Sequence, residues 1–190
     1  FNYTNIFARI SYNKSIDQIR NLTTFESVVA SSSPFNSPFA DENFSANGRF
    51  QRQFGKIRAS LSGGINFSKF NQYISDINNP SISENFSQNY GATVRTSFKE
   101  APNVELGYNY SLTNNILGNV ESKFYTKAPF IDVDALILKS FTFRSRYTNN
   151  SFSNERAVLN EYEFWDASLA YKKDQDSKWE FELKATNLLN

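Results

Sequence analysis

The stretch Val104-Glu-Leu-Gly-Tyr-Asn-Tyr-Ser-Leu-Thr113 decides the fold, because apolar and polar residues alternate in it position by position. A repeat of two residues places successive side chains on opposite sides of an extended chain. The stretch therefore predicts a β-strand with one apolar and one polar face. Such a strand lies between an apolar environment and water.

The same alternation recurs about nine times along the chain. The predicted strands are 6–13, 44–54, 57–68, 90–99, 104–113, 131–137, 141–148, 165–171 and 179–186. Short turns are predicted at 55–56, 100–102, 138–140 and 174–176, and longer polar segments at 16–43, 76–84, 114–120 and 149–156. Short turns at one end and long loops at the other are typical of outer-membrane barrels. Because 16–43 is rich in Ser, Asn and Pro, we expect a long extracellular loop with little regular structure there.

The composition excludes several classes of function. The 190 residues include 19 Phe, 10 Tyr and 2 Trp, but no Cys and no His, and the net charge is +1. Without Cys there are no disulfides or thiolate metal sites, and without His the commonest general base and zinc ligand are missing. We therefore expect no enzyme, cofactor or metal site. A near-neutral chain is also a poor partner for nucleic acid.

The two predicted faces need different surroundings. The polar face carries charged side chains or amides on every strand, and these must meet water. The apolar face carries aliphatic or small residues in mid-strand and aromatic residues near strand ends, as expected where Tyr, Trp and Phe mark membrane interfaces. Predicted girdle residues on the short-turn side are Phe54, Phe98, Phe141, Tyr171 and Trp179. Those on the long-loop side are Tyr12, Phe67, Tyr90, Tyr110, Tyr147 and Trp165. The pattern predicts an all-β, antiparallel, up-and-down portion of a transmembrane β-barrel in outer-membrane lipid.

The register follows from the rule that facing residues share a face. Around Lys139 this rule pairs Ile137 with Phe141, Asp134 with Arg144 and Asp132 with Arg146. Around Gln175 it pairs Tyr171 with Trp179 and Asp166 with Lys184. Opposite charges would then meet on the lumen side, where each pair stabilises the sheet by roughly 0.2–1 kcal/mol.

Other candidate sites are weaker. Loop aromatic residues are candidates for stacking on a ligand, with packing of the loops as the alternative; they include Phe35, Phe39, Tyr73 and Phe86. The Asp76–Pro80 stretch offers oxygen ligands for Ca²⁺ but also fits an Asn-Pro turn. Carboxylates two residues apart, as in Asp132/Asp134, Glu161/Glu163 and Glu180/Glu182, are a feature of glycoside hydrolases, yet a hydrated lumen face explains them better.

Three segments resemble TonB-dependent outer-membrane receptors, in particular the Bacteroidetes-type outer-membrane β-barrel family. They are the closing segment 179–190, the preceding 166–173, and the loop-like 33–39. The resemblance implies that residues 1–190 form one partial barrel domain. This domain would be an open piece of about nine strands, taken from near the C-terminus of a 22-stranded barrel and lacking its last strand.

The resemblance also implies a function and a location. These residues would be wall and extracellular loops of a receptor in the bacterial outer membrane. It would import a siderophore, glycan, peptide or cobalamin-type nutrient with energy from the TonB complex, which acts through parts outside this chain. A surface lipoprotein is a candidate partner. The alternative hypothesis is a structural or adhesive all-β surface protein without transport activity.

Overall fold

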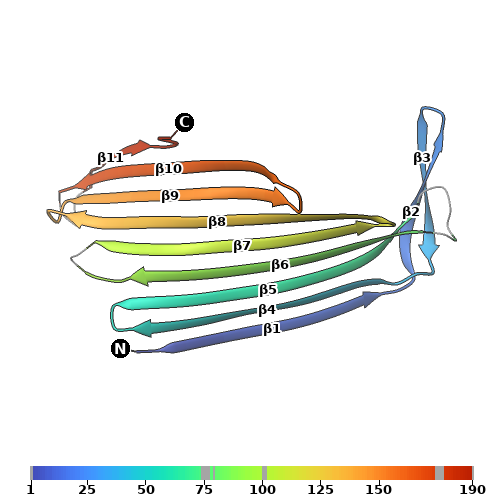
Figure 1. Cartoon of the computed structure of the whole chain (residues 1–190), viewed down its shortest axis with the longest axis horizontal. Coiled ribbons are helices and arrows are strands. Elements are labelled where there is room, and N and C mark those ends of the chain that lie inside the picture. Colours follow the sequence, from blue (N-terminus) through green and yellow to red (C-terminus); the bar gives the residue numbers. More distant parts are fainter. Residues whose placement is uncertain (1, 74–77, 79, 100–101, 174–177, 190) are drawn as a thin grey trace.

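The computed structural model describes residues 2–73, 78, 80–99, 102–173 and 178–189, and the described residues form strands and turns without helices (Figure 1). The strands are β1 (Thr4–Ser15), β2 (Gln18–Glu26), β3 (Val29–Ser37), β4 (Asp41–Phe54), β5 (Ile57–Gln72), β6 (Ser81–Thr96), β7 (Asn103–Leu117), β8 (Val120–Ile137), β9 (Phe141–Asn154), β10 (Val158–Lys172) and β11 (Glu180–Ala185). No helix capable of crossing a membrane is found among these residues.

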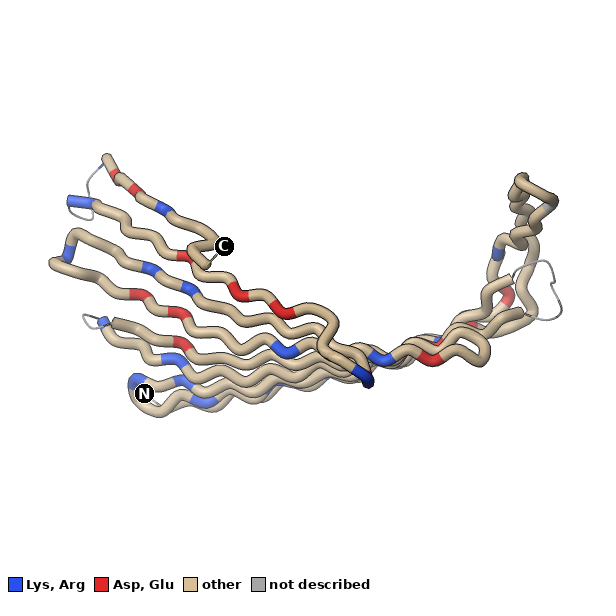
Figure 2. Tube along the Cα trace, turned by 45° about the horizontal axis from the view of Figure 1, so that its top comes forward, with Lys and Arg blue, Asp and Glu red and all other residues tan. Residues whose placement is uncertain are grey.

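Nine of the strands form one antiparallel sheet, as the alternation predicts. Its order is β1-β4-β5-β6-β7-β8-β9-β10-β11, so neighbours in the chain are neighbours in the sheet except where the β2–β3 hairpin is inserted. The sheet is twisted, as L-amino acids require, and it ends at β1 on one side and β11 on the other (Figures 1 and 2).

The strands are longer than predicted, so two of the predicted long loops are wrong. β7 continues to Leu117 and β8 begins at Val120, with Gly118 at a φ of 57° in the turn between them. Likewise β9 continues through most of the segment 149–156. Beyond the predicted strand ends polar and apolar residues no longer alternate regularly, yet the extended chain continues. Of the predicted loop 76–84, Ser81 to Glu84 belong to β6, whereas 76, 77 and 79 lie outside the described residues.

The prediction of an irregular loop at 16–43 is also wrong, because β2 and β3 pair over their full length in a two-stranded sheet. The hairpin turns at Ser27, which has a φ of 55°. Hydroxyls link the strands, with Thr24 and Ser31 side-chain oxygens 2.6 Å apart. Pro34 fits because both strands are edges, where a missing N–H is tolerated. Both faces of this hairpin carry polar residues, so the sequence shows no alternation of apolar and polar residues that would predict its strands.

A small buried cluster fixes the hairpin to the end of β5. The Tyr73 ring packs edge-on against Phe35 with centroids 4.6 Å apart, and its hydroxyl hydrogen-bonds the Ser37 hydroxyl. Tyr73 and Ser37 are only 5% and 2% exposed. The Arg20 guanidinium forms an ion pair with Asp41 at the base of the hairpin. The hairpin therefore has a core of its own, unlike most of the sheet.

The observed register confirms one predicted hairpin and corrects another. Across β8 and β9, Ile137 pairs with Phe141, Asp134 with Arg144 and Asp132 with Arg146, as predicted.

Across β10 and β11 the predicted register is wrong by two residues. Tyr171 pairs with Phe181 instead of Trp179, and Lys184 pairs with Ser168 instead of Asp166. The chain between Lys172 and Glu180 is longer than a three-residue turn, and Trp179 precedes β11. A shift by two keeps every side chain on its predicted face, so the faces are right although the partners are not.

Candidate functional site: the two faces of the sheet

The outer face of the sheet, which contains Leu106 and its register partners, carries a belt of exposed apolar side chains. Ten representative members have exposed fractions between 39% and 75%: Ile6, Ile10, Phe50, Leu61, Val94, Leu106, Ile131, Trp165, Leu169 and Leu183. Together they cover all strands of the main sheet except β9. Contiguous exposed apolar surface of this extent is rare on monomeric soluble proteins, and it marks contact with a membrane or a partner.

The belt stops abruptly at charged residues on the same face. On β1 to β6 the border is a row of alternating charges, with Lys14–Glu42 and Lys69–Glu84 ion pairs of 2.9 and 3.1 Å. On β10 the border is Glu163, which follows Trp165 on this face. The prediction that Glu161 and Glu163 face the lumen with Asp132 and Asp134 is therefore wrong: they lie on the outer face.

The border of the belt follows one row of register partners from β1 to β6 and then crosses the rows toward the turns between β6 and β10. The row through Trp165 contains Tyr147, Ile131, Leu106, Val94, Ala59, Arg52 and Thr4. On β10 the belt ends at Trp165, but on β1 it continues to Tyr12, eight residues beyond Thr4. Eight residues of strand span about 27 Å, and the seven spacings from β1 to β10 span about 34 Å. Averaged from β1 to β10, the border is inclined to the rows by roughly 40°, against a strand tilt of about 35–45° in membrane barrels.

Aromatic side chains lie near the border and near the turns, as predicted. Phe141 and Tyr171 have ring centroids 4.9 Å apart beside the 138–140 turn. At the border, Trp165 donates its Nε1–H to Ser145 Oγ at 2.9 Å. A partly polar ring suits the level where lipid meets water, and the interfacial role of these residues stays a prediction.

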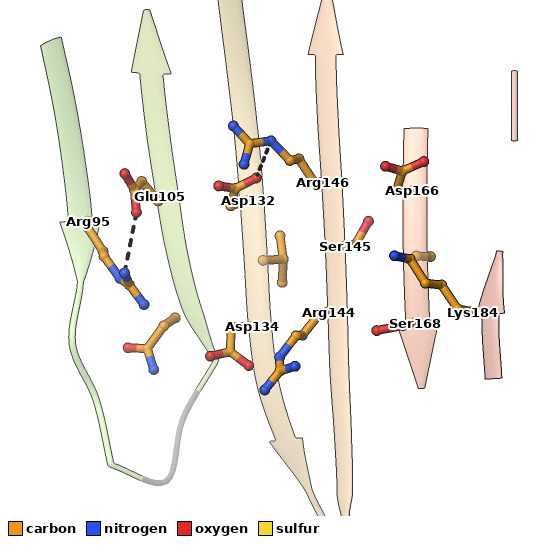
Figure 3. A pocket seen from close by; sticks show the side chains of 13 residues that line it. Arg95, Glu105, Asp132, Asp134, Arg144, Ser145, Arg146, Asp166, Ser168 and Lys184 are labelled. Atoms are coloured by element: carbon orange, nitrogen blue, oxygen red, sulfur yellow. Dashed lines mark ion pairs between the residues drawn. The ribbon is translucent and has the colours of Figure 1, made fainter. Parts of the chain in front are cut away.

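The inner face, on the opposite side of the sheet, carries the predicted charges near the turns (Figure 3). One row contains Arg95, Glu105, Asp132, Arg146 and Asp166, and the next contains Asn103, Asp134, Arg144, Ser168 and Lys184. The Arg95–Glu105 and Asp132–Arg146 ion pairs are both 3.5 Å long. These rows line a hollow of about 340 Å³. Figure 2 shows how acidic and basic residues alternate on neighbouring strands.

The predicted charge pairs therefore come together, with one change of partner. Asp134 and Arg144 lie side by side, and Lys184 extends from β11 toward β10 between Asp166 and Ser168 (Figure 3). Because the rows are nearly balanced in charge, they suit a hydrated surface better than a site for one strongly charged ligand.

A feature that sequence reasoning missed is the packing of Phe130 on the inner face. Its ring lies over Gly107, so close that a Cβ there would be 2.2 Å from the ring. The Arg146 guanidinium covers the ring at 5.2 Å from its centroid. Phe130 is only 9% exposed as a result. The signal in the sequence was the break of the polar pattern at Gly107 and Phe130, which the register makes direct partners.

Farther from the turns, the inner face has a second hollow of about 680 Å³. Its lining is dominated by amides, hydroxyls and glycines; members from the middle strands are Asn47, Ser62, Gly64, Asn89, Gly91, Asn109, Ser111 and Thr126. Arg49 is its charged member, so this lining carries far less charge than the rows near the turns.

The four predicted ligand-contacting aromatic residues do not form one site. Tyr73 is buried against Phe35 under the hairpin, so both rings serve packing. Phe39 is 39% exposed near the hairpin base. Phe86 lies on the outer face of β6, in register with Phe67. Phe152 of β9, also among the loop aromatic residues of that prediction, lies on the inner face, as do Tyr162 and Phe164 of β10.

Within the described residues no group of three or more acidic side chains is arranged to hold a metal ion. Most of the Asp76–Pro80 stretch lies outside the described residues. A scan against protein-family models and searches of curated proteins and of solved structures found no match.

Proposed function

We propose that this sheet is part of the wall of a transmembrane β-barrel in the outer membrane. The observation that carries the proposal is the oblique apolar belt on the outer face. On β5 the belt runs from Ile57 to Phe67, close to the 9–11 residues that a tilted strand needs to cross a bilayer. A sheet packed in a soluble protein has no reason to end its apolar surface along a border whose average slant is close to barrel tilt.

The unpaired edges support a larger barrel. Among the described residues no strand pairs with the far side of β1, whose twelve residues include the exposed Ile6 and Ile10. A long apolar edge is an aggregation hazard unless another strand pairs with it. Further strands joining β1 and β11 would close the wall around the polar inner face.

Import of a nutrient, driven by the TonB complex through parts outside this chain, is the activity that we propose for the barrel. It rests on the sequence resemblance of 179–190, 166–173 and 33–39, together with a hydrated inner face that a solute could traverse. An adhesive surface protein remains the second candidate, favoured only by the projecting β2–β3 hairpin with its exposed Phe25 and Val28.

Cysteine labelling tests the wall directly, because the chain has no native Cys. Single variants Ile65→Cys and Lys127→Cys are made in the full-length protein and exposed to a water-soluble maleimide in intact outer-membrane vesicles. The register partners of Ile65 on the neighbouring strands lead to Tyr125 on β8. Ile65 therefore lies in a row that is farther from the turns than the row of Lys127. We nevertheless expect Ile65→Cys to resist labelling and Lys127→Cys to react, because the slant keeps only Ile65 in lipid.

Denatured protein provides the control, since both cysteines must then react equally. Equal labelling of both positions in vesicles would contradict the membrane wall, as would extraction of the protein without detergent. Uptake of nutrients by cells with and without TonB tests the transport part separately.

A further inference from the structure

Three adjacent rows of the inner face share an unusual composition. The first row contains Arg9, Asn47, Gly64, Asn89, Ser111, Thr126, Phe152 and Asn160. The second contains Phe7, Arg49, Ser62, Gly91, Asn109 and Ala128, with Tyr162 on β10 at the same level. The third contains Asn5, Gln51, Ser60, Thr93, Gly107, Phe130, Thr148 and Phe164.

From β5 to β10 the floor of these rows is uncharged and rich in both donors and acceptors. They hold no carboxylate, and their charged residues are Arg9 and Arg49 at the β1–β4 side. Each amide offers two donors and an acceptor, and each hydroxyl offers both functions. Gly64 and Gly91 keep the floor low, which leaves the hollow of about 680 Å³.

Aromatic rings border this floor on β9 and β10. Phe152, Tyr162 and Phe164 remain 36%, 41% and 42% exposed. Tyr162 and Phe164 meet edge to face with centroids 5.3 Å apart, and Phe152 stacks on Phe124 at 5.4 Å. Neighbouring rings hold one another in place, so their free faces form a firm apolar border beside a polar floor.

We infer that this inner-face track binds a neutral oligosaccharide, an inference that rests on the proposed role of the sheet as a barrel wall. A sugar chain presents hydroxyls, which need paired donors and acceptors, and C–H faces, which fit the electron-rich faces of aromatic rings. Between β5 and β10 an anionic ligand would find no cation in these rows, and a cationic ligand would find no carboxylate. An extended peptide would lack free backbone groups along most of the track, because β4 to β9 are paired on both sides.

The test measures binding of immobilised neutral glycans of varied linkage to the detergent-purified full-length protein, followed by calorimetry with a glycan that binds. We expect at least one neutral glycan to bind. Tyr162→Ala should weaken Kd roughly tenfold by removing the platform, whereas Tyr162→Phe should keep most of the affinity because the ring remains.

A matched pair of amides tests the floor. Asn89 faces the track and its chain neighbour Gln88 faces outward on the same strand. We expect Asn89→Ala to weaken glycan binding several-fold, since it removes hydrogen bonds to hydroxyls, and Gln88→Ala to leave Kd unchanged.

Binding confined to charged glycans or peptides, or no binding across the neutral set, would overturn the inference. Equal loss in Asn89→Ala and Gln88→Ala would also overturn it, because the track would then not be the site. The maleimide experiment separates the proposal of a membrane wall from the proposal of an oligosaccharide track. If Ile65→Cys is protected in lipid but no neutral glycan binds, the result supports the membrane wall and contradicts the oligosaccharide track.

Discussion

The two halves of the outer face are built from the same strands, yet they are stabilised in different ways. Near the turns the face is an apolar belt, and the described residues bury almost none of it within the sheet. Beyond the border the face carries ion pairs such as Lys69–Glu84, and the chain there builds a small core around Tyr73. If the sheet is the proposed membrane wall, lipid takes the place of a protein core in the first half, whereas the second half, in water, builds a core of its own.

The largest expected effect comes from placing a charge inside the belt. Leu61→Arg should destabilise the lipid-embedded protein by about 2–4 kcal/mol, because a guanidinium near the bilayer centre is poorly solvated. Ser62→Arg is the matched control, since Ser62 faces the hydrated inner side of the same strand. Urea titration in lipid vesicles, followed by the fluorescence of the two Trp residues, measures both. Equal destabilisation by the two variants would remove the distinction between the faces.

The second effect tests the core beyond the border. Tyr73→Ala should destabilise the attachment of the hairpin by about 3 kcal/mol, because it deletes a buried ring. Tyr73→Phe keeps the ring and loses only the hydrogen bond to Ser37, at a cost of about 1 kcal/mol. Hydrogen exchange of the β2 and β3 amides should rise strongly in the first variant and slightly in the second, while exchange in β7 stays unchanged. Faster exchange throughout the sheet would mean that the two halves are not independent.

Much of this division was predictable from the alternation of residues. Parity assigns Asp132 and Arg146 to one face, because facing residues must share a face, and the predicted turn at 138–140 makes them partners. Parity does not fix the length of a turn, so a shift by two at β11 left Lys184 opposite Ser168 while keeping its face.

The rest depended on information that no single strand contains. The β2–β3 hairpin has polar residues on both faces, so its pairing leaves no apolar period. The slant of the belt emerges only when the register of all strands is known, since Trp165 and Tyr12 look alike as aromatic strand ends. The same holds for Phe130 and Gly107, which are distant in sequence and direct partners in the sheet.

The smallest expected effect concerns an exposed ion pair in the half that faces water. Lys123 Nζ lies 3.0 Å from Glu121 and 3.1 Å from Glu155, and Asn114 donates a hydrogen bond to Glu121 at 2.9 Å. The hydrogen bond from Lys123, with that from Asn114, lowers the pKa of the Glu121 carboxyl below its ordinary value. A lowered pKa means that the charged carboxylate favours the folded protein above the unfolded pKa. That contribution is lost as the pH falls through the folded pKa.

Lys123→Gln should therefore raise the pKa of Glu121 toward its ordinary value and flatten this part of the pH dependence. The carboxyl carbon shift of Glu121, followed by NMR during an acid titration, measures the change. Lys127→Gln removes a different cation from the same face of β8 and should leave the titration of Glu121 unchanged. Because the pair is solvent-exposed, water screens it and the effect on overall stability should be close to the detection limit. A large loss of stability in Lys123→Gln would mean that this level of the strand is shielded from water, and the border of the belt would then have to lie beyond Lys123.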